Sequence, residues 1–197
     1  MKLRQAAKVR LFIAIEIPEY IRNTFASLLK DFRSVAPHLK WIPAGNLHVT
    51  LKFLGETDAS NLDALQNVLA SIRSDDPVHL EFRGLGFFPS EKRPRVLSAG
   101  MEASANLKSL AEDIDQAARS LGFPLEERPF TPHLTLARLP LPGIPPKLLQ
   151  AMIHINEKAG HSFGSLSTTS FHLIESKLKP GGAEYTTVQT FHFAAEA

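Results

Sequence analysis

The chain of 197 residues contains no cysteine. This absence excludes disulfide bonds, thiolate metal sites and cysteine nucleophiles, and it suits a protein of the reducing cytoplasm. Long hydrophobic runs are missing as well. The apolar stretch at residues 11–15 is too short for a signal-peptide core, and no segment reaches the ~18 consecutive apolar residues of a transmembrane helix. We therefore expect a soluble cytoplasmic protein without a membrane partner.

A marked excess of charge of either sign is also lacking. The 22 Lys and Arg residues and the 20 Asp and Glu residues leave a formal net charge of +2. This balance argues against a protein that coats long nucleic acids, but it tolerates a phosphate-bearing end as substrate. With 44% hydrophobic and 21% charged residues, the composition predicts one large globular domain, or two small lobes that share a core.

Hydrophobic periodicity in the first half of the chain predicts strands alternating with helices. The first strand is the most apolar, so we expect it to lie centrally in a sheet. The expected elements are a strand at 9–17, a helix at 19–33, a strand at 47–54 ended by Gly55, a helix capped by Asp58 or Ser60 that runs to about residue 73, and strands at 78–82 and 95–101 joined by an exposed basic loop.

The second half repeats this plan, with a helix at 104–121 stopped by Gly122 and a strand at 133–139. Strands at 170–178 and 185–193 are expected to form a hairpin through residues 180–182. The segment 140–164 is the least regular. Its four prolines between residues 140 and 146 predict a surface excursion followed by a short helix at 147–155.

One four-residue pattern occurs twice. The segments LHVTLKFLG and PHLTLARLP share His, apolar, Thr, apolar, at residues 48–51 and 133–136. For 8 histidines and 44% hydrophobic residues, chance predicts about 0.08 copies, so two copies indicate a true repeat. Because side chains alternate along a strand, each motif places its His and Thr on one face. Two such strands side by side would bring four polar groups to one groove.

Structural and metal-binding explanations of the motif histidines were weighed against this one. A lone strand histidine usually satisfies a local hydrogen bond, but the doubling favours a functional pair. Neither motif carries an Asp or Glu at ligand spacing, and threonine is a poor ligand, so we expect no metal and no cofactor. The remaining histidines are interpreted as surface or locally satisfied residues, two of which, His172 and His192, would pair across the hairpin; the others are His38, His79, His154 and His161.

The motifs and several longer segments resemble the two-histidine (2H) phosphoesterases, and among them the bacterial and archaeal RNA 2′,3′-cyclic phosphodiesterases once called 2′-5′ RNA ligases. The resemblance spans nearly the whole chain except residues 140–161. It rests on RLFIAIEIP at Arg10, NLHVTLKFLGE at Asn46, LGFFPSEKRPRVLSAG at Leu85, ERPFTPHLTLAR at Glu127 and FHLIESKLKPGGAEYTTV at Phe171. It implies one α+β domain over residues 1–197, with two pseudo-symmetric lobes whose antiparallel sheets form a central cleft, helices outside and one motif in each lobe.

The resemblance also implies a reaction. The substrate is an RNA end carrying a 2′,3′-cyclic phosphate, for example a tRNA-derived end, and a monomeric enzyme hydrolyses it to a 2′-phosphomonoester without metal. One group must take a proton from water and another must give one to the leaving ribose oxygen, which imidazoles with a pKa of about 6.5 do well. The resemblance assigns His48 as proton donor and His133 as proton acceptor, whereas the residues alone leave these roles open.

Further residues are candidates for substrate binding. The hydroxyls of Thr50 and Thr135 suit the nonbridging phosphate oxygens, with simple strand propensity as the alternative. Phe130, or an aromatic at residues 87–88, would stack on the terminal base, with core packing as the alternative.

Three cations are weaker candidates for contacts to the phosphate. Lys52 continues the face of the first motif, and Arg128 precedes the second. Arg138 follows the second motif, but in a regular strand it faces away from His133. A solvated surface position explains each of them equally well.

Two other functions were considered. A 2′-5′ RNA ligase or nuclease would use the same histidines, and the sequence does not separate it from a cyclic phosphodiesterase. A noncatalytic nucleotide- or RNA-binding module would have kept the cleft and lost turnover, and the two intact histidines argue against it.

Overall fold

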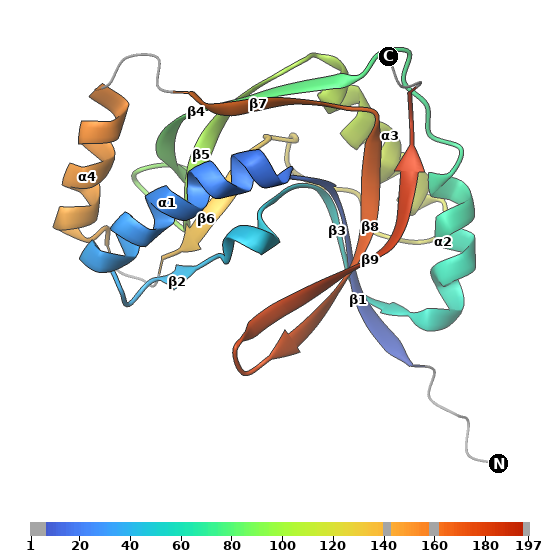
Figure 1. The fold of residues 1–197 in the computed structure, drawn as a ribbon. Coiled ribbons are helices and arrows are strands. Elements are labelled where there is room, and N and C mark those ends of the chain that lie inside the picture. Colours follow the sequence, from blue (N-terminus) through green and yellow to red (C-terminus); the bar gives the residue numbers. More distant parts are fainter. Residues whose placement is uncertain (1–6, 140–142, 158–161, 195–197) are drawn as a thin grey trace.

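The structure, a computed structural model, describes residues 7–139, 143–157 and 162–194. These ranges form a curled antiparallel sheet with helices packed against it (Figure 1). The strands are β1 (Lys8–Glu16), β2 (Lys40–Trp41), β3 (His48–Asp58), β4 (Val78–Phe88), β5 (Val96–Ala103), β6 (Leu134–Arg138), β7 (Ser162–Thr168), β8 (Ser170–Lys179) and β9 (Gly182–His192). The helices are α1 (Glu19–Val35), α2 (Leu62–Leu69), α3 (Asn106–Arg119) and α4 (Pro146–Glu157), with 3-10 turns at Ala44–Asn46 and Ala59–Asn61.

The sheet consists of two matching halves. Its strand order is β7-β4-β5-β6-β3-β1-β8-β9, with β2 added beside β6. The halves β7-β4-β5-β6 and β3-β1-β8-β9 meet where β6 pairs with β3, the two strands that carry the repeated motifs. The expected α+β fold with pseudo-symmetric lobes is confirmed, although the two lobes share one continuous sheet.

Helix α1 shows how the helices bind the sheet. Its apolar positions recur at helical spacing, and Ile21, Phe25, Leu29 and Phe32 are all buried. The Phe25 ring lies 6.1 Å from that of Phe82 on β4, edge to face. Residues of α2 and α3 join the same core cluster, which also contains the apolar residues of both motifs. The core therefore occupies the face of the sheet opposite the histidines and threonines.

Three expected elements differ from the observed ones. Strand β4 runs to Phe88, so only residues 89–95 of the expected loop connect it to β5. Strand β3 continues past Gly55, because this glycine, at φ +72°, lets Leu54 bulge out of the pairing with β1 and does not end the strand. Helix α2 is shorter than expected and follows a 3-10 turn capped by Asp58, whose side chain accepts from the Ser60 N–H.

The irregular segment holds α4, as expected, whereas residues 140–142 and 158–161, including His161, lie outside the described residues. Strands β2 and β7 were not anticipated. Strand β2 has two residues, and β7 is rich in serine and threonine, so neither carries a strong hydrophobic pattern. No helix in the described part of the chain combines the length and apolar character needed to cross a membrane.

Candidate active site

The two motifs meet at the junction of the two halves of the sheet. Val49 of β3 pairs with Leu134 of β6 in an antiparallel register, and both side chains are fully buried in the core. Extending this register by one residue in each direction places His48 opposite Thr135, and Thr50 opposite His133. Directly opposite residues have Cβ atoms about 5 Å apart. The four polar side chains therefore form one compact group on the face away from the core.

Both histidines are held in the same tautomer. The Nδ1–H of His48 donates to the backbone carbonyl of Asn46 at 2.7 Å, and that of His133 donates to the carbonyl of Thr131 at 2.9 Å. A carbonyl oxygen only accepts hydrogen bonds, so Nδ1 carries the proton in each ring. Each Nε2 is thus left to exchange a proton in the cleft.

Aromatic rings fix the orientation of each imidazole. Phe88, at the end of β4, stacks on His133 with ring centroids 4.2 Å apart and planes inclined by 9°. His48 lies 4.7 Å from Phe12 and 5.4 Å, edge to face, from Tyr185. The sequence pointed to residues 87–88 for base stacking, whereas the structure gives Phe88 a contact with the second histidine.

The electrostatic environment of His48 favours its neutral form in the ligand-free protein. Burial lowers the pKa of His48 below its ordinary 6.5, and the positive charges of Arg138 and His133 act in the same direction. The hydrogen bond to the Asn46 carbonyl and the carboxylate of Glu16 oppose this shift. Since a bound phosphate is anionic, it also opposes the shift and favours the imidazolium.

Two residues that the sequence did not identify connect His48 to the β8–β9 hairpin. The side-chain amide of Asn46, whose carbonyl holds His48, donates to the Ala183 carbonyl of β9 at 2.7 Å. Thr187 of β9 donates to Glu16 at 2.7 Å. Only the turn residues before the first motif hinted at Asn46, because the hairpin lies more than 130 residues further along the chain.

A β-bulge occurs at the same place in both motifs. On β3, Thr50 pairs with Ala14 and Lys52 with Ile13, so Leu51 is the extra residue. On β6, Thr135 pairs with Ser98 and Ala137 with Leu97, so Leu136 is the extra residue. A bulge shifts the alternation of side chains by one residue. The internal repeat therefore extends from the sequence motif to the backbone geometry.

The bulge at Leu51 makes the expectation for Lys52 wrong. This residue points to the core side, where its side chain is 1% exposed and pairs with Asp115 of α3. Its ammonium also donates to the Pro124 carbonyl at 2.9 Å. Phe53 takes its place on the face of His48 and is 60% exposed. Lys52 thus stabilises the packing of α3 on β3 and does not contact the cleft.

The bulge at Leu136 corrects the placement of Arg138 in the opposite way. Arg138 pairs with Val96, which lies two residues from Ser98 on β5, so Arg138 shares the face of Thr135. Its charge acts on His48, as the lowered pKa of that histidine shows. A regular alternation had assigned it to the other face.

The remaining candidates are less closely tied to the histidines. Phe130 is half-buried and packs against the core, which was the alternative for this residue. Arg128 is exposed in the segment before β6. His172 does not pair with His192, because the cross-strand neighbour of its Nδ1 is the Thr190 hydroxyl, at 3.0 Å.

We predict that Lys52→Met lowers the free energy of unfolding by about 3 kcal/mol, since removing one partner of a buried ion pair leaves the other unpaired. Urea unfolding followed by circular dichroism measures this change. Lys108→Met is the matched control, because Lys108 pairs with Glu112 on the exposed surface at 3.6 Å and should affect stability far less. If Lys52→Met instead kept full stability and lost activity, Lys52 would belong to the cleft after all.

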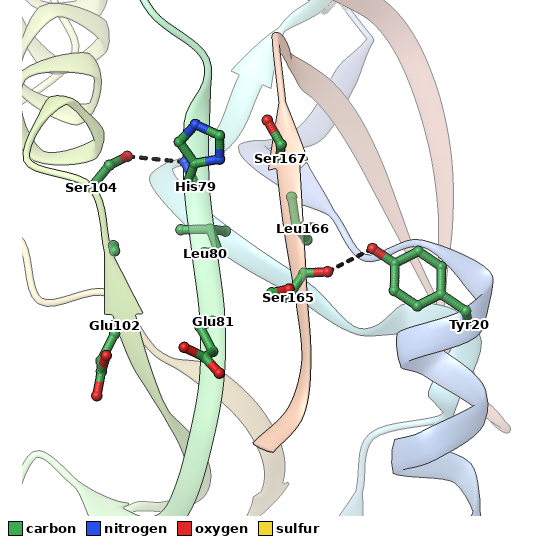
Figure 2. Close-up of a pocket in the computed structure, with 10 residues that line it drawn as sticks. Tyr20, His79, Leu80, Glu81, Glu102, Ser104, Ser165, Leu166 and Ser167 are labelled. Atoms are coloured by element: carbon green, nitrogen blue, oxygen red, sulfur yellow. Dashed lines mark hydrogen bonds between the residues drawn. The ribbon is translucent and has the colours of Figure 1, made fainter. Parts of the chain in front are cut away.

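Cavity size alone does not locate the site. A cavity of about 540 Å³ at the outer strands, shown in Figure 2, is lined by Tyr20, His79, Glu81, Glu102 and serines of β7, and it contains no motif residue. A smaller cavity of about 110 Å³ includes His48, Asn46 and Tyr185. Among the described residues, no cluster of three or more His, Asp or Glu side chains is placed to hold a metal ion. We assign the chemistry to the histidine group because its geometry is repeated in both halves.

Comparison with known protein families gives a match in each half of the chain. The model described as "LigT like Phosphoesterase" matches residues 15–98 and again residues 100–185, so each match contains one motif. An RNA 2′,3′-cyclic phosphodiesterase from Methanothermobacter thermautotrophicus is 31% identical over 93% of this chain and 98% of its own length. One from Thermus thermophilus is 36% identical over 95% of this chain and 92% of its own length.

Solved structures agree with these sequence matches. A crystal structure from Thermus thermophilus superposes with a TM-score of 0.71 at 33% identity, over 93% of this chain and 97% of the other. The crystal structure of E. coli LigT complexed with 3′-AMP gives a TM-score of 0.74 at 28% identity, over 95% of this chain and 99% of the other. The curled antiparallel sheet is thus shared with structures of this type.

Proposed function

This chain belongs to the family of LigT-like phosphoesterases, and we propose that it opens the 2′,3′-cyclic phosphate at an RNA end to leave a 2′-phosphomonoester. Its activity is that of an RNA 2′,3′-cyclic phosphodiesterase. The observation that carries the proposal is the matched pair of imidazoles, each locked by a backbone carbonyl so that Nε2 is available for proton transfer. A noncatalytic binding module has no need for two such tautomers.

The proposed reaction moves one proton at each histidine. Nε2 of His133 takes a proton from water as the water oxygen bonds to phosphorus. The bond between phosphorus and the ribose 3′ oxygen breaks, and the imidazolium of His48 gives its Nε2 proton to that oxygen. The ring of His48 ends neutral and that of His133 protonated, and exchange with solvent resets the pair.

The two threonines have a different task in this scheme. The hydroxyls of Thr50 and Thr135 donate to the nonbridging phosphate oxygens, whose charge grows as water adds. Each threonine lies opposite the histidine of the other motif, so one phosphate contacts both halves of the sheet. The E. coli relative complexed with 3′-AMP supports a nucleotide end in this cleft.

A two-histidine mechanism has no role for a divalent ion. We therefore propose an enzyme without metal or cofactor, a cytoplasmic monomer that acts on ends such as those derived from tRNA. A 2′-5′ ligase or nuclease acting through the same histidines stays the alternative, and no observation favours it.

The proposal predicts full turnover in excess EDTA. An oligoribonucleotide that ends in a 2′,3′-cyclic phosphate is incubated with the protein, and phosphorus NMR distinguishes 2′- from 3′-phosphate in the product. A 2′-phosphate is expected. A 3′-phosphate would show that the other ribose oxygen leaves and would overturn the assigned stereochemistry. Activity lost in EDTA and restored by a divalent ion would replace the histidine mechanism with a metal-assisted one.

A further inference from the structure

A second cavity, of about 510 Å³, begins beside the histidine site. It lies between β2, the end of β6 and the β8–β9 hairpin, which projects from the body of the molecule in Figure 1. Asn46 and Tyr185 line both this cavity and the small one around His48. Its size falls within the range of small-molecule sites, about 300–1,000 Å³. Any ligand that extends beyond the reactive phosphate on this side would enter it.

The charges around this cavity are positive. Lys40 of β2 pairs directly with Arg138 of β6, and both line the cavity together with Arg10. Like charges directly opposite each other on neighbouring strands are destabilising. In the part of the chain that the structure describes, none of these three cations has a carboxylate within ion-pair distance, and no Asp or Glu lines this cavity. The arrangement is therefore suited to an anion between Lys40 and Arg138.

The cavity also exposes apolar side chains that a purely anionic ligand would not need. Phe53 is 60% exposed and Leu178 is 71% exposed, and both line its wall. The β-bulge at Leu51 places Phe53 on this face, 6.2 Å from Phe12. An exposed aromatic ring beside a track of cations is the arrangement by which proteins bind unpaired nucleotides.

The outer cavity of Figure 2 provides a contrast. It has a similar volume, but two carboxylates, Glu81 and Glu102, lie directly opposite each other on β4 and β5 and line it. Such a wall repels phosphate. The cavity at Lys40 is thus distinguished by its chemistry and by its continuity with His48.

We propose that this cavity binds the nucleotide on the 5′ side of the cyclic phosphate. The first internal phosphodiester lies between Lys40 and Arg138, and the base of this nucleotide stacks on Phe53. The inference rests on the proposed function, because the cyclic phosphate ends the RNA and the rest of the chain must leave on its 5′ side. The preferred substrate class is then a single-stranded RNA end of at least two nucleotides, since stacking on Phe53 needs an unpaired base.

The test compares kcat/KM for adenosine 2′,3′-cyclic phosphate and for the diadenosine dinucleotide that ends in the same group. The parent protein should favour the dinucleotide by about 10-fold or more. Lys40→Gln should reduce this preference about 10-fold, and Phe53→Ala about 5- to 100-fold, whereas Phe53→Tyr should retain it. Lys30→Gln is the control, because Lys30 is an exposed residue of α1 that lines neither cavity.

Salt dependence gives an independent readout. For a single strand, each phosphate contact contributes about 0.7 to the slope of log kcat/KM against log salt, so Lys40→Gln should flatten the slope for the dinucleotide by that amount. Equal kcat/KM for the two substrates in the parent protein would overturn the subsite. An unchanged preference in folded Lys40→Gln and Phe53→Ala would do the same. Failure to turn over either substrate would instead overturn the proposed function.

Discussion

Replacing either His48 or His133 by alanine is expected to lower kcat/KM on a cyclic-phosphate end by at least about 100-fold, because one acid-base group supplies roughly 10²- to 10⁴-fold. The double variant should lose much less than the product of the two single losses, since both groups act in one step. All three variants are measured on one oligoribonucleotide, with circular dichroism to confirm folding. His79→Ala is the matched control, because His79 is an exposed strand histidine outside the motifs.

The single variants also carry information on pH. A rate that needs one neutral and one protonated imidazole gives a bell, whose limbs belong to the pair. Because burial lowers the pKa of His48, its limb in kcat/KM should lie below pH 6.5 and vanish in His48→Ala. The anionic substrate favours the imidazolium, so the same limb should lie at higher pH in kcat. A folded alanine variant within a few-fold of the parent would show that its histidine moves no proton in the rate-determining step.

Removing the hydroxyl of Thr50 or Thr135 by substitution with valine is expected to reduce kcat roughly 10- to 1000-fold, the range found for a donor that stabilises charge in a transition state. Valine keeps the branched shape and the strand propensity, so the fold should persist. Because the hydroxyls move no proton in the scheme, the pH limits of the bell should stay in place while its height falls.

Thr57→Val provides the control for the threonine variants. Thr57 lies on the same strand as Thr50 and is 3% exposed, but it is far from the motif and its hydroxyl donates to the Gly55 carbonyl. Its variant should keep the parental kcat. If Thr50→Val and Thr135→Val also turn over like the parent, the threonines serve only to form the strands.

The repeated motif made the centre of the site predictable from the sequence. The pattern His, apolar, Thr, apolar fixes which side chains share a face over three residues, and burial of Val49 and Leu134 confirms it. The same alternation failed one residue later, at Lys52 and Arg138. A bulge depends on how a strand pairs with its neighbour, which a single strand's pattern does not contain.

Contacts between distant segments were equally out of reach. Phe88 stacks on His133, and Asn46 holds the hairpin at Ala183, yet neither pair shares a local pattern in the sequence. Nor did the sequence suggest that Lys40 lies opposite Arg138, because β2 is only two residues long. These contacts determine the orientation of the imidazoles and the charge of the cavity beside them.

The sequence by itself determined the α+β class, the strand–helix order, the two histidines and the two threonines, because these follow from local periodicity and from a repeat that chance does not produce. Only the tertiary structure decided that both halves share one sheet and which cations face the cleft. The reason is physical: strand register and bulges are set by hydrogen bonds between segments far apart in the chain. A shift of one residue there sends Lys52 into the core and brings Phe53 and Arg138 to the substrate side.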